Sequence, residues 1–116
     1  MRHSDAPPRV MSAMQRDAPM CHVDATLEHA TETLDSRDGW QHCVVVNDAG
    51  VVMGLVPRDA GGLTRPLADA MRAGPTTVRP DIPLDEAYER MRKSNVTERV
   101  VTDPTGRLLG VLRLSD

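Results

Sequence analysis

The stretch VVVNDAGVVMGLV, residues 44–56, has the pattern of two short buried strands joined by a tight turn. Three valines lead into an Asn/Asp-containing turn that ends at Gly50, and an apolar run interrupted by Gly54 follows. The segment VVTDPTGRLLGVL, residues 100–112, repeats both glycines at a constant offset of 56 in the numbering (106 − 50 and 110 − 54). A repeat at this period predicts that one supersecondary unit is used twice, with a surface between the copies.

Each strand pair is preceded by an extended segment that runs into a helix, MCHVDATLEHATETL at residues 20–34 and TVRPDIPLDEAYERM at residues 77–91. Side-chain acceptors and a proline mark the helix starts, at Asp24 and Thr26 in the first segment and at Asp81 and Pro83 in the second. Apolar residues at helical spacing follow in both, so each helix is expected to bury one face. The helix offset is 57 (81 − 24) and the strand offset is 56, so the first copy has one extra residue near Trp40.

Two short segments, VMSAM at residues 10–14 and LADAM at residues 67–71, also match at an offset of 57. Each predicts one short turn of helix leading into the unit that follows, and each is followed by a proline or Gly-Pro break. The predicted order is therefore strand, helix, strand, strand, written twice. This order predicts an α/β (α+β) fold of tandem β-α-β-β repeats.

Composition limits the class of protein. The 116 residues suffice for one compact domain, and 40% hydrophobic with 27% charged residues is ordinary for a globular protein. A net charge of −3 with scattered arginines lacks the basic face that nucleic-acid binding needs. No run reaches the roughly 18 apolar residues of a membrane helix, and no secretory signal is apparent. These features predict a cytoplasmic protein with neither a nucleic-acid nor a membrane partner.

Catalytic and metal-binding patterns are missing from the sequence. Cys21 and Cys43 form no CxxC pair, and their spacing to the histidines at 22, 29 and 42 matches no standard zinc pattern. The cysteines are interpreted as small buried residues of a reduced protein. No nucleophile elbow, phosphate-cradling glycine loop or HExxH motif occurs. The sequence thus predicts a protein that is not an enzyme and holds no metal.

The sequence resembles a CBS domain pair, a tandem of β-α-β-β units widely used as adenosyl-nucleotide sensors. The resemblance rests on the strand pairs HCVVVNDAGVVMGLV and ERVVTDPTGRLLGVL, the pre-helix segments HVDATLEHA and VRPDIPLDEA, and the AM dipeptides at 13–14 and 70–71. It implies one compact Bateman-type module with pseudo-two-fold symmetry. Its expected divisions are a flexible tail at 1–9, repeat 1 at 10–60, a linker at 61–66 and repeat 2 at 67–116.

The resemblance also implies ligand-binding residues in the cleft between the repeats. In nucleotide-binding members, the extended segment before the helix and the start of the next strand sandwich the base, and an Asp after the last strand accepts from the ribose. These positions correspond to Thr77, Val78, Val96, Arg99, Arg113 and Asp116 for one site, and to Cys21, His22, Trp40, Arg58 and Asp59 for the other. The ligand implied is an adenine nucleotide such as AMP, ADP or ATP, with no certain cofactor.

This sequence departs from the family pattern at several of these positions. Arg113 and Pro57 stand where the family has Thr, and Val44 and Val100 replace the usual Pro before the paired valines. Arg113 is either a phosphate ligand or a solvated surface arginine. Trp40 is a base-stacking residue, a lid on the core or a dimer contact.

Two functional hypotheses follow from the resemblance. The first is a regulatory module that binds an adenosyl-type nucleotide and acts on an unidentified partner protein. The alternative is a ligand-free CBS pair that serves as a dimerisation or protein-interaction scaffold. Both include a homodimer, because such pairs usually stack their helices across a two-fold axis and this chain is small for its apolar content.

Overall fold

A computed structural model of the protein describes residues 8–58 and 66–114. Most of the predicted tail and linker lies outside these ranges. The elements in chain order are α1 (Val10–Ala13), β1 (Met20–His22), α2 (Leu27–Asp35), β2 (His42–Val46), β3 (Val52–Pro57), α3 (Leu67–Ala70), β4 (Arg72–Ala73), β5 (Thr77–Val78), α4 (Leu84–Ser94), β6 (Glu98–Thr102) and β7 (Leu108–Arg113). The predicted order of strand, helix, strand and strand, occurring twice, is confirmed. No helix in the described part of the chain is long and apolar enough to span a membrane.

The two long helices begin and end where local chemistry requires it. Thr26 caps α2, because its hydroxyl accepts a hydrogen bond from the backbone N–H of His29 at 3.1 Å. Pro83 precedes α4, which therefore begins without a side-chain cap. Asn95 ends α4 in the left-handed conformation, at φ 58°. The apolar face of each helix is buried against the sheet of its own repeat, as the spacing predicts.

The strands form one sheet in each repeat. The first sheet has the order β1-β2-β3-β4 and the second has the order β5-β6-β7. In both, the first strand is parallel to the second, and the second and third strands form an antiparallel hairpin. Cys43 pairs with Val56 in the first hairpin, and Arg99 pairs with Leu112 in the second. Cys43 and Arg99 are 56 residues apart, and so are Val56 and Leu112. The two hairpins therefore have the same register.

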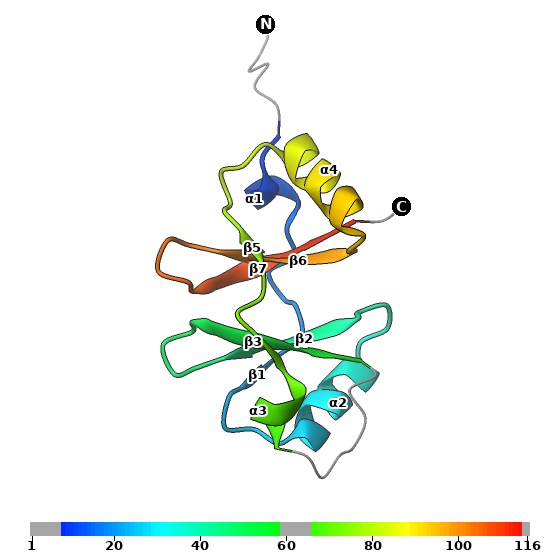
Figure 1. Cartoon of the computed structure of the whole chain (residues 1–116), viewed down its shortest axis with the longest axis vertical. Coiled ribbons are helices and arrows are strands. Elements are labelled where there is room, and N and C mark those ends of the chain that lie inside the picture. The colour runs from blue at the N-terminus through cyan, green and yellow to red at the C-terminus, as the bar shows by residue number, and fades with distance from the viewer. Residues whose placement is uncertain (1–7, 59–65, 115–116) are drawn as a thin grey trace, which may run out of the picture.

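The two short helices are exchanged between the repeats (Figure 1). Helix α1 precedes repeat 1 in the chain but packs beside α4, where Val10 joins the core of repeat 2. Helix α3 precedes repeat 2 but packs on repeat 1, where Leu67 is buried with the residues of α2. The segment after α3 then adds β4 to the edge of β3, a strand that the sequence pattern does not predict. The exchange ties both halves into one unit.

The two sheets lie face to face, with the helices on their outer sides (Figure 1). Their hairpin turns are joined by two backbone hydrogen bonds of 2.9 Å, from Val52 N–H to the Gly106 carbonyl and from Leu108 N–H to the Gly50 carbonyl. Val44 of the first sheet and Val100 of the second belong to the same buried cluster. The seam between the sheets leaves two clefts, and these clefts frame the candidate site.

Candidate functional site

The larger cleft at the seam, called here the open cleft, has a volume of about 620 Å³. Repeat 1 contributes the start of β2 and Leu55 of β3 to its walls, and the chain segments 72–76 and 95–100 supply the remainder. Two predicted site residues, Val96 and Arg99, line it. Both are half-buried, so each has a surface available within the cleft.

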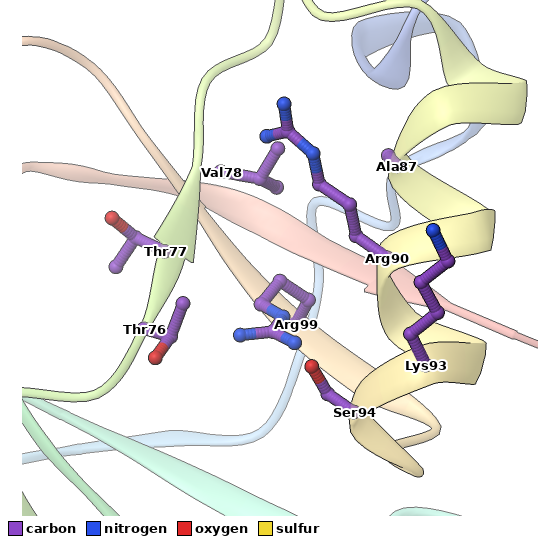
Figure 2. A pocket seen from close by; sticks show the side chains of 8 residues that line it. All are labelled: Thr76, Thr77, Val78, Ala87, Arg90, Lys93, Ser94 and Arg99. Carbon is purple, nitrogen blue, oxygen red and sulfur yellow. The ribbon is translucent and has the colours of Figure 1, made fainter.

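A second cavity, called here the basic pocket, adjoins the open cleft and has a volume of about 340 Å³. It lies between β5, α4 and the start of β6, and Figure 2 shows its eight lining side chains. The predicted residues Thr77, Val78 and Arg99 are brought together here. Thr76 and Arg99 line both the pocket and the open cleft, so the two spaces are continuous at these residues.

Three cations surround the basic pocket. In Figure 2, Arg99 lies in the space between β5 and α4, and Arg90 reaches into the same space from the helix. Within the described part of the chain, Arg99 has no hydrogen-bond or ion-pair partner. Arg90 and Lys93 pair with carboxylates one turn earlier, but their side chains are 64% and 76% exposed. Such surface pairs contribute little, so both cations are free to turn towards an anion in the pocket.

The sequence reasoning did not select Arg90 and Lys93. A comparison of the two helices at the offset of 57 contains the missing signal, because the corresponding residues of the first repeat are Thr33 and Ser36. Cys43 occupies the position that corresponds to Arg99. These three positions are therefore cationic in repeat 2 and uncharged in repeat 1.

The predicted site of the first repeat has a different environment. The thiols of Cys21 and Cys43 are buried, with 3.7 Å between their sulfur atoms. Cys43 donates to Cys21, and this hydrogen bond lowers the pKa of Cys21 and, together with burial, raises the pKa of Cys43. His22 accepts from the N–H of Asp24 at 3.0 Å and contacts Asp48 through its other ring nitrogen at 2.5 Å.

Arg58 and Trp40 also have protein partners. The Arg58 guanidinium donates to the carbonyls of Trp40, Leu34 and Arg37 at 2.8, 3.0 and 3.0 Å, and thereby closes the C-terminal end of α2. Trp40 is 4% exposed. Asp59 and Asp116, the two predicted ribose ligands, lie outside the described residues. No group of three or more His, Cys, Asp or Glu within residues 8–58 and 66–114 is placed to hold a metal ion.

A smaller cleft at the seam has a volume of about 330 Å³, shares Gln41, Thr97 and Glu98 with the open cleft, and is called here the closed cleft. Arg113, which the sequence leaves as either a phosphate ligand or a solvated surface arginine, lines this cleft and not the open one. Its guanidinium lies over the Trp40 ring, 4.1 Å from the ring centroid. The structure therefore separates Arg113 from Thr77, Val78, Val96 and Arg99, which share the open cleft and the basic pocket.

Comparison with known proteins identifies this architecture. The sequence model of the CBS domain matches residues 10–60 and 67–116, which together make up most of the chain. The protein is a pair of CBS domains. The resemblance seen in the sequence is thus confirmed, and so is the fold of two β-α-β-β units.

The CBS pair also has a relative among curated proteins, the arabinose 5-phosphate isomerase KpsF of Escherichia coli O6:H1 (strain CFT073). The two are 30% identical over 118 residues, which cover 93% of this chain and 36% of the isomerase. The chain thus spans about a third of the length of this relative.

Two solved structures show the same fold. The crystal structure of CBSX2 in complex with AMP has a TM-score of 0.82 at 18% identity, and covers 91% of this chain and 90% of that chain. The CBS domain pair of protein MJ0100, in complex with 5′-methylthioadenosine and S-adenosyl-L-methionine, has a TM-score of 0.77 at 19% identity, and covers 93% and 90%. Similarity at this level of identity shows the fold alone.

Proposed function

We propose that this CBS pair is a regulatory module that binds an adenosyl-type nucleotide in the open cleft. The observation that carries the proposal is the position of Arg99, a half-buried and unpaired guanidinium at the junction of the open cleft and the basic pocket. Arg99 has no counter-ion among the described residues. A guanidinium without a counter-ion favours the binding of an anion. Two proteins with the same fold, CBSX2 and the CBS domain pair of MJ0100, form complexes with adenosyl compounds, which supports the choice of ligand.

The lining of the two spaces suits the two ends of a nucleotide. Thr77, Val78 and Val96 offer the extended backbone and apolar surface that the family resemblance implies for a base. Arg99, with Arg90 and Lys93 around it, offers positive charge for a phosphate group. We therefore infer that phosphorylated ligands such as AMP, ADP or ATP bind more tightly than S-adenosylmethionine, whose sulfonium is positively charged.

Thermal unfolding with a panel of ligands tests this proposal. A ligand that binds only the folded state raises the melting temperature, and the rise grows with affinity. AMP and ATP at millimolar concentration should raise it most, adenosine less and S-adenosylmethionine least, with inorganic phosphate at equal ionic strength as the control. Failure of all four compounds to stabilise the protein would refute the proposal and favour the alternative, a ligand-free dimerisation or interaction scaffold.

We infer a regulatory role and not a catalytic one, since the sequence contains no nucleophile elbow, phosphate-cradling glycine loop or HExxH motif. The similarity to an arabinose 5-phosphate isomerase covers only 36% of that enzyme, so its activity is not carried over to this chain. The regulated protein is unidentified. A homodimer remains a prediction, and sedimentation that shows only monomer at tens of micromolar would contradict it.

A further inference from the structure

The duplicated fold allows each cleft to be compared with the other, residue by residue. Gly39 and Asn95, both with positive φ (86° and 58°), occupy corresponding places at the offset of 56, so the residues that follow them also correspond. Trp40, a core residue that lies beneath Arg113 at the closed cleft, therefore matches Val96 of the open cleft. By the strand register, Arg113 of the closed cleft matches Pro57. Two residues distinguish the closed cleft: Trp40, which has a large aromatic ring, and Arg113, whose guanidinium covers that ring.

Arg113 is held in the closed cleft by three kinds of contact. Its Cζ lies 4.1 Å from the centroid of the Trp40 ring, within the range of a cation–π interaction. Its Nη2 donates to the Gly39 carbonyl. Its Nε is 3.8 Å from Oε2 of Glu98, whose side chain is only 5% exposed. These contacts hold the guanidinium over the Trp40 ring.

Glu98 is itself anchored between the repeats. Its Oε2 accepts from the N–H of Gln41 at 2.8 Å, and its Oε1 lies 3.1 Å from Nδ1 of His42, both in repeat 1. A buried carboxylate held in this way needs a cation, which Arg113 supplies. Glu98 lines both clefts, so the feature that distinguishes the closed cleft is Arg113, which does not line the open cleft. The Trp40 ring and the Glu98 carboxylate thus both have a partner within the protein, the Arg113 guanidinium.

We propose that Arg113 is an internal occupant of the closed cleft, which takes the Trp40 face where a base would stack and so confines the nucleotide to the open cleft. The space that remains in the closed cleft is about 330 Å³, against about 620 Å³ in the open cleft. The expected stoichiometry is one adenosyl ligand per chain, although the symmetric fold provides two clefts. The stoichiometry rests on the proposed function, whereas the occupancy by Arg113 does not.

Trp40 is the only tryptophan of the chain, so its fluorescence reports on the closed cleft. Adenosine serves as the probe because it is uncharged and Glu98 does not repel it. In the Arg113→Ala variant, adenosine should quench the Trp40 emission saturably, because a base can then stack on the exposed ring. Arg37→Ala is the matched control, since this arginine also lies over the ring, at 5.7 Å, but does not line the cleft.

The result expected is saturable quenching in Arg113→Ala at concentrations at least about tenfold below any effect in the wild type or in Arg37→Ala, a difference of about 1.4 kcal/mol. Calorimetry should give one AMP per wild-type chain. Equal quenching in wild type and Arg113→Ala would overturn the proposal, and so would the absence of quenching from both Arg113→Ala and Arg113→Ala/Glu98→Gln. The double variant removes the buried charge that the single variant leaves unpaired.

The two proposals fail in different ways. If the wild type binds no AMP by calorimetry but Arg113→Ala gains the adenosine-dependent quenching, the proposed function is wrong and the role of Arg113 stands. If the wild type binds two AMP per chain and AMP alters the Trp40 emission, the ligand enters the closed cleft with Arg113 in place. That result would overturn the role of Arg113 and leave the proposed function intact.

Discussion

Gly54 and Gly110 occupy corresponding positions in the two hairpins, and each is crossed by the segment that leads into the other half of the chain. A Cβ atom built on Gly54 would lie 2.8 Å from the carbonyl oxygen of Arg72. A Cβ atom on Gly110 would lie 2.7 Å from the carbonyl oxygen of Gln15. The recurrent second glycine of the sequence pattern is therefore explained by a backbone crossing, which holds α1 and α3 on exchanged repeats.

We expect Gly54→Ala and Gly110→Ala to destabilise the protein by about 1–3 kcal/mol each, because backbone atoms cannot move aside as a flexible side chain does. Urea unfolding followed by circular dichroism measures this loss. Met53→Ala, in the same strand and 37% exposed in the wild type, is the control. If the glycine variants lose no more stability than this control, the crossings are not tightly packed in solution.

Arg99 has no hydrogen-bond or ion-pair partner among residues 8–58 and 66–114, which leads to a prediction about nucleotide affinity. A charge-assisted hydrogen bond contributes about 1.5–3 kcal/mol, so Arg99→Gln should weaken AMP binding roughly 10- to 100-fold. Adenosine binding should change far less, because it lacks the phosphate. Arg92→Gln on α4 is the control, since Arg92 lies over the ring of Tyr88 at 6.0 Å and does not line the basic pocket. Equal losses in both variants, measured by calorimetry, would show that Arg99 has no specific role.

The buried thiols allow a chemical test of the fold of repeat 1. Cys21 is 5% exposed and Cys43 is fully buried, so neither should react readily with an aromatic disulfide reagent in the native protein. Unfolding in urea should release both thiols, and colorimetry measures their number. Val45→Ala, which removes a fully buried neighbour on β2, should accelerate the native reaction by loosening the core. Rapid reaction of one thiol in the native wild type would contradict the burial of this pair.

Local patterns were sufficient to predict the repeated units from the sequence. The strand pairs around Gly50 and Gly106 and the helix that begins after Thr26 depend on alternation, turn residues and capping, all of which are read from near neighbours in the chain. The exchange of α1 and α3 was not predictable in this way, because such a short helix fits either sheet. Arg113 and Trp40 lie in different repeats, so their contact became visible only in the folded chain.

The family resemblance indicates which sequence positions could bind a ligand, but it does not indicate which side chains surround each of them. The candidate site was therefore predicted only in part. The resemblance placed Thr77, Val78, Val96 and Arg99 together, and the structure brings these four residues to adjoining spaces. It also grouped Arg113 with them, although this residue lines the closed cleft. Side-chain partners such as the Glu98 carboxylate depend on both repeats at once, so one repeat pattern cannot disclose them.

The two hairpin turns share a pair of hydrogen bonds from backbone N–H groups to a side-chain oxygen, but the acceptor is a carboxylate in one turn and a neutral amide in the other. This difference predicts how stability depends on pH. Asp103 accepts from the hydroxyl and N–H of Thr105 and from the N–H of Arg107, at 2.7, 2.9 and 3.0 Å. The bond from the Thr105 hydroxyl is the main reason that the pKa of Asp103 lies below its ordinary value of 3.8. At the corresponding place in repeat 1, the neutral amide of Asn47 accepts from two backbone N–H groups.

A carboxylate with a lowered pKa binds fewer protons in the folded than in the unfolded protein. Its contribution to stability is therefore complete above pH 3.8 or so and is lost as the pH falls through the lowered pKa. We expect Asp103→Asn, which copies the turn of repeat 1, to melt close to the wild type at pH 7 and to lose less stability below pH 4. Asp103→Ala, which lacks the acceptor, should melt lower at both pH values. Melting curves from pH 2 to 7 check this, and an unchanged acid slope in Asp103→Asn would show that this carboxylate is not the group that titrates.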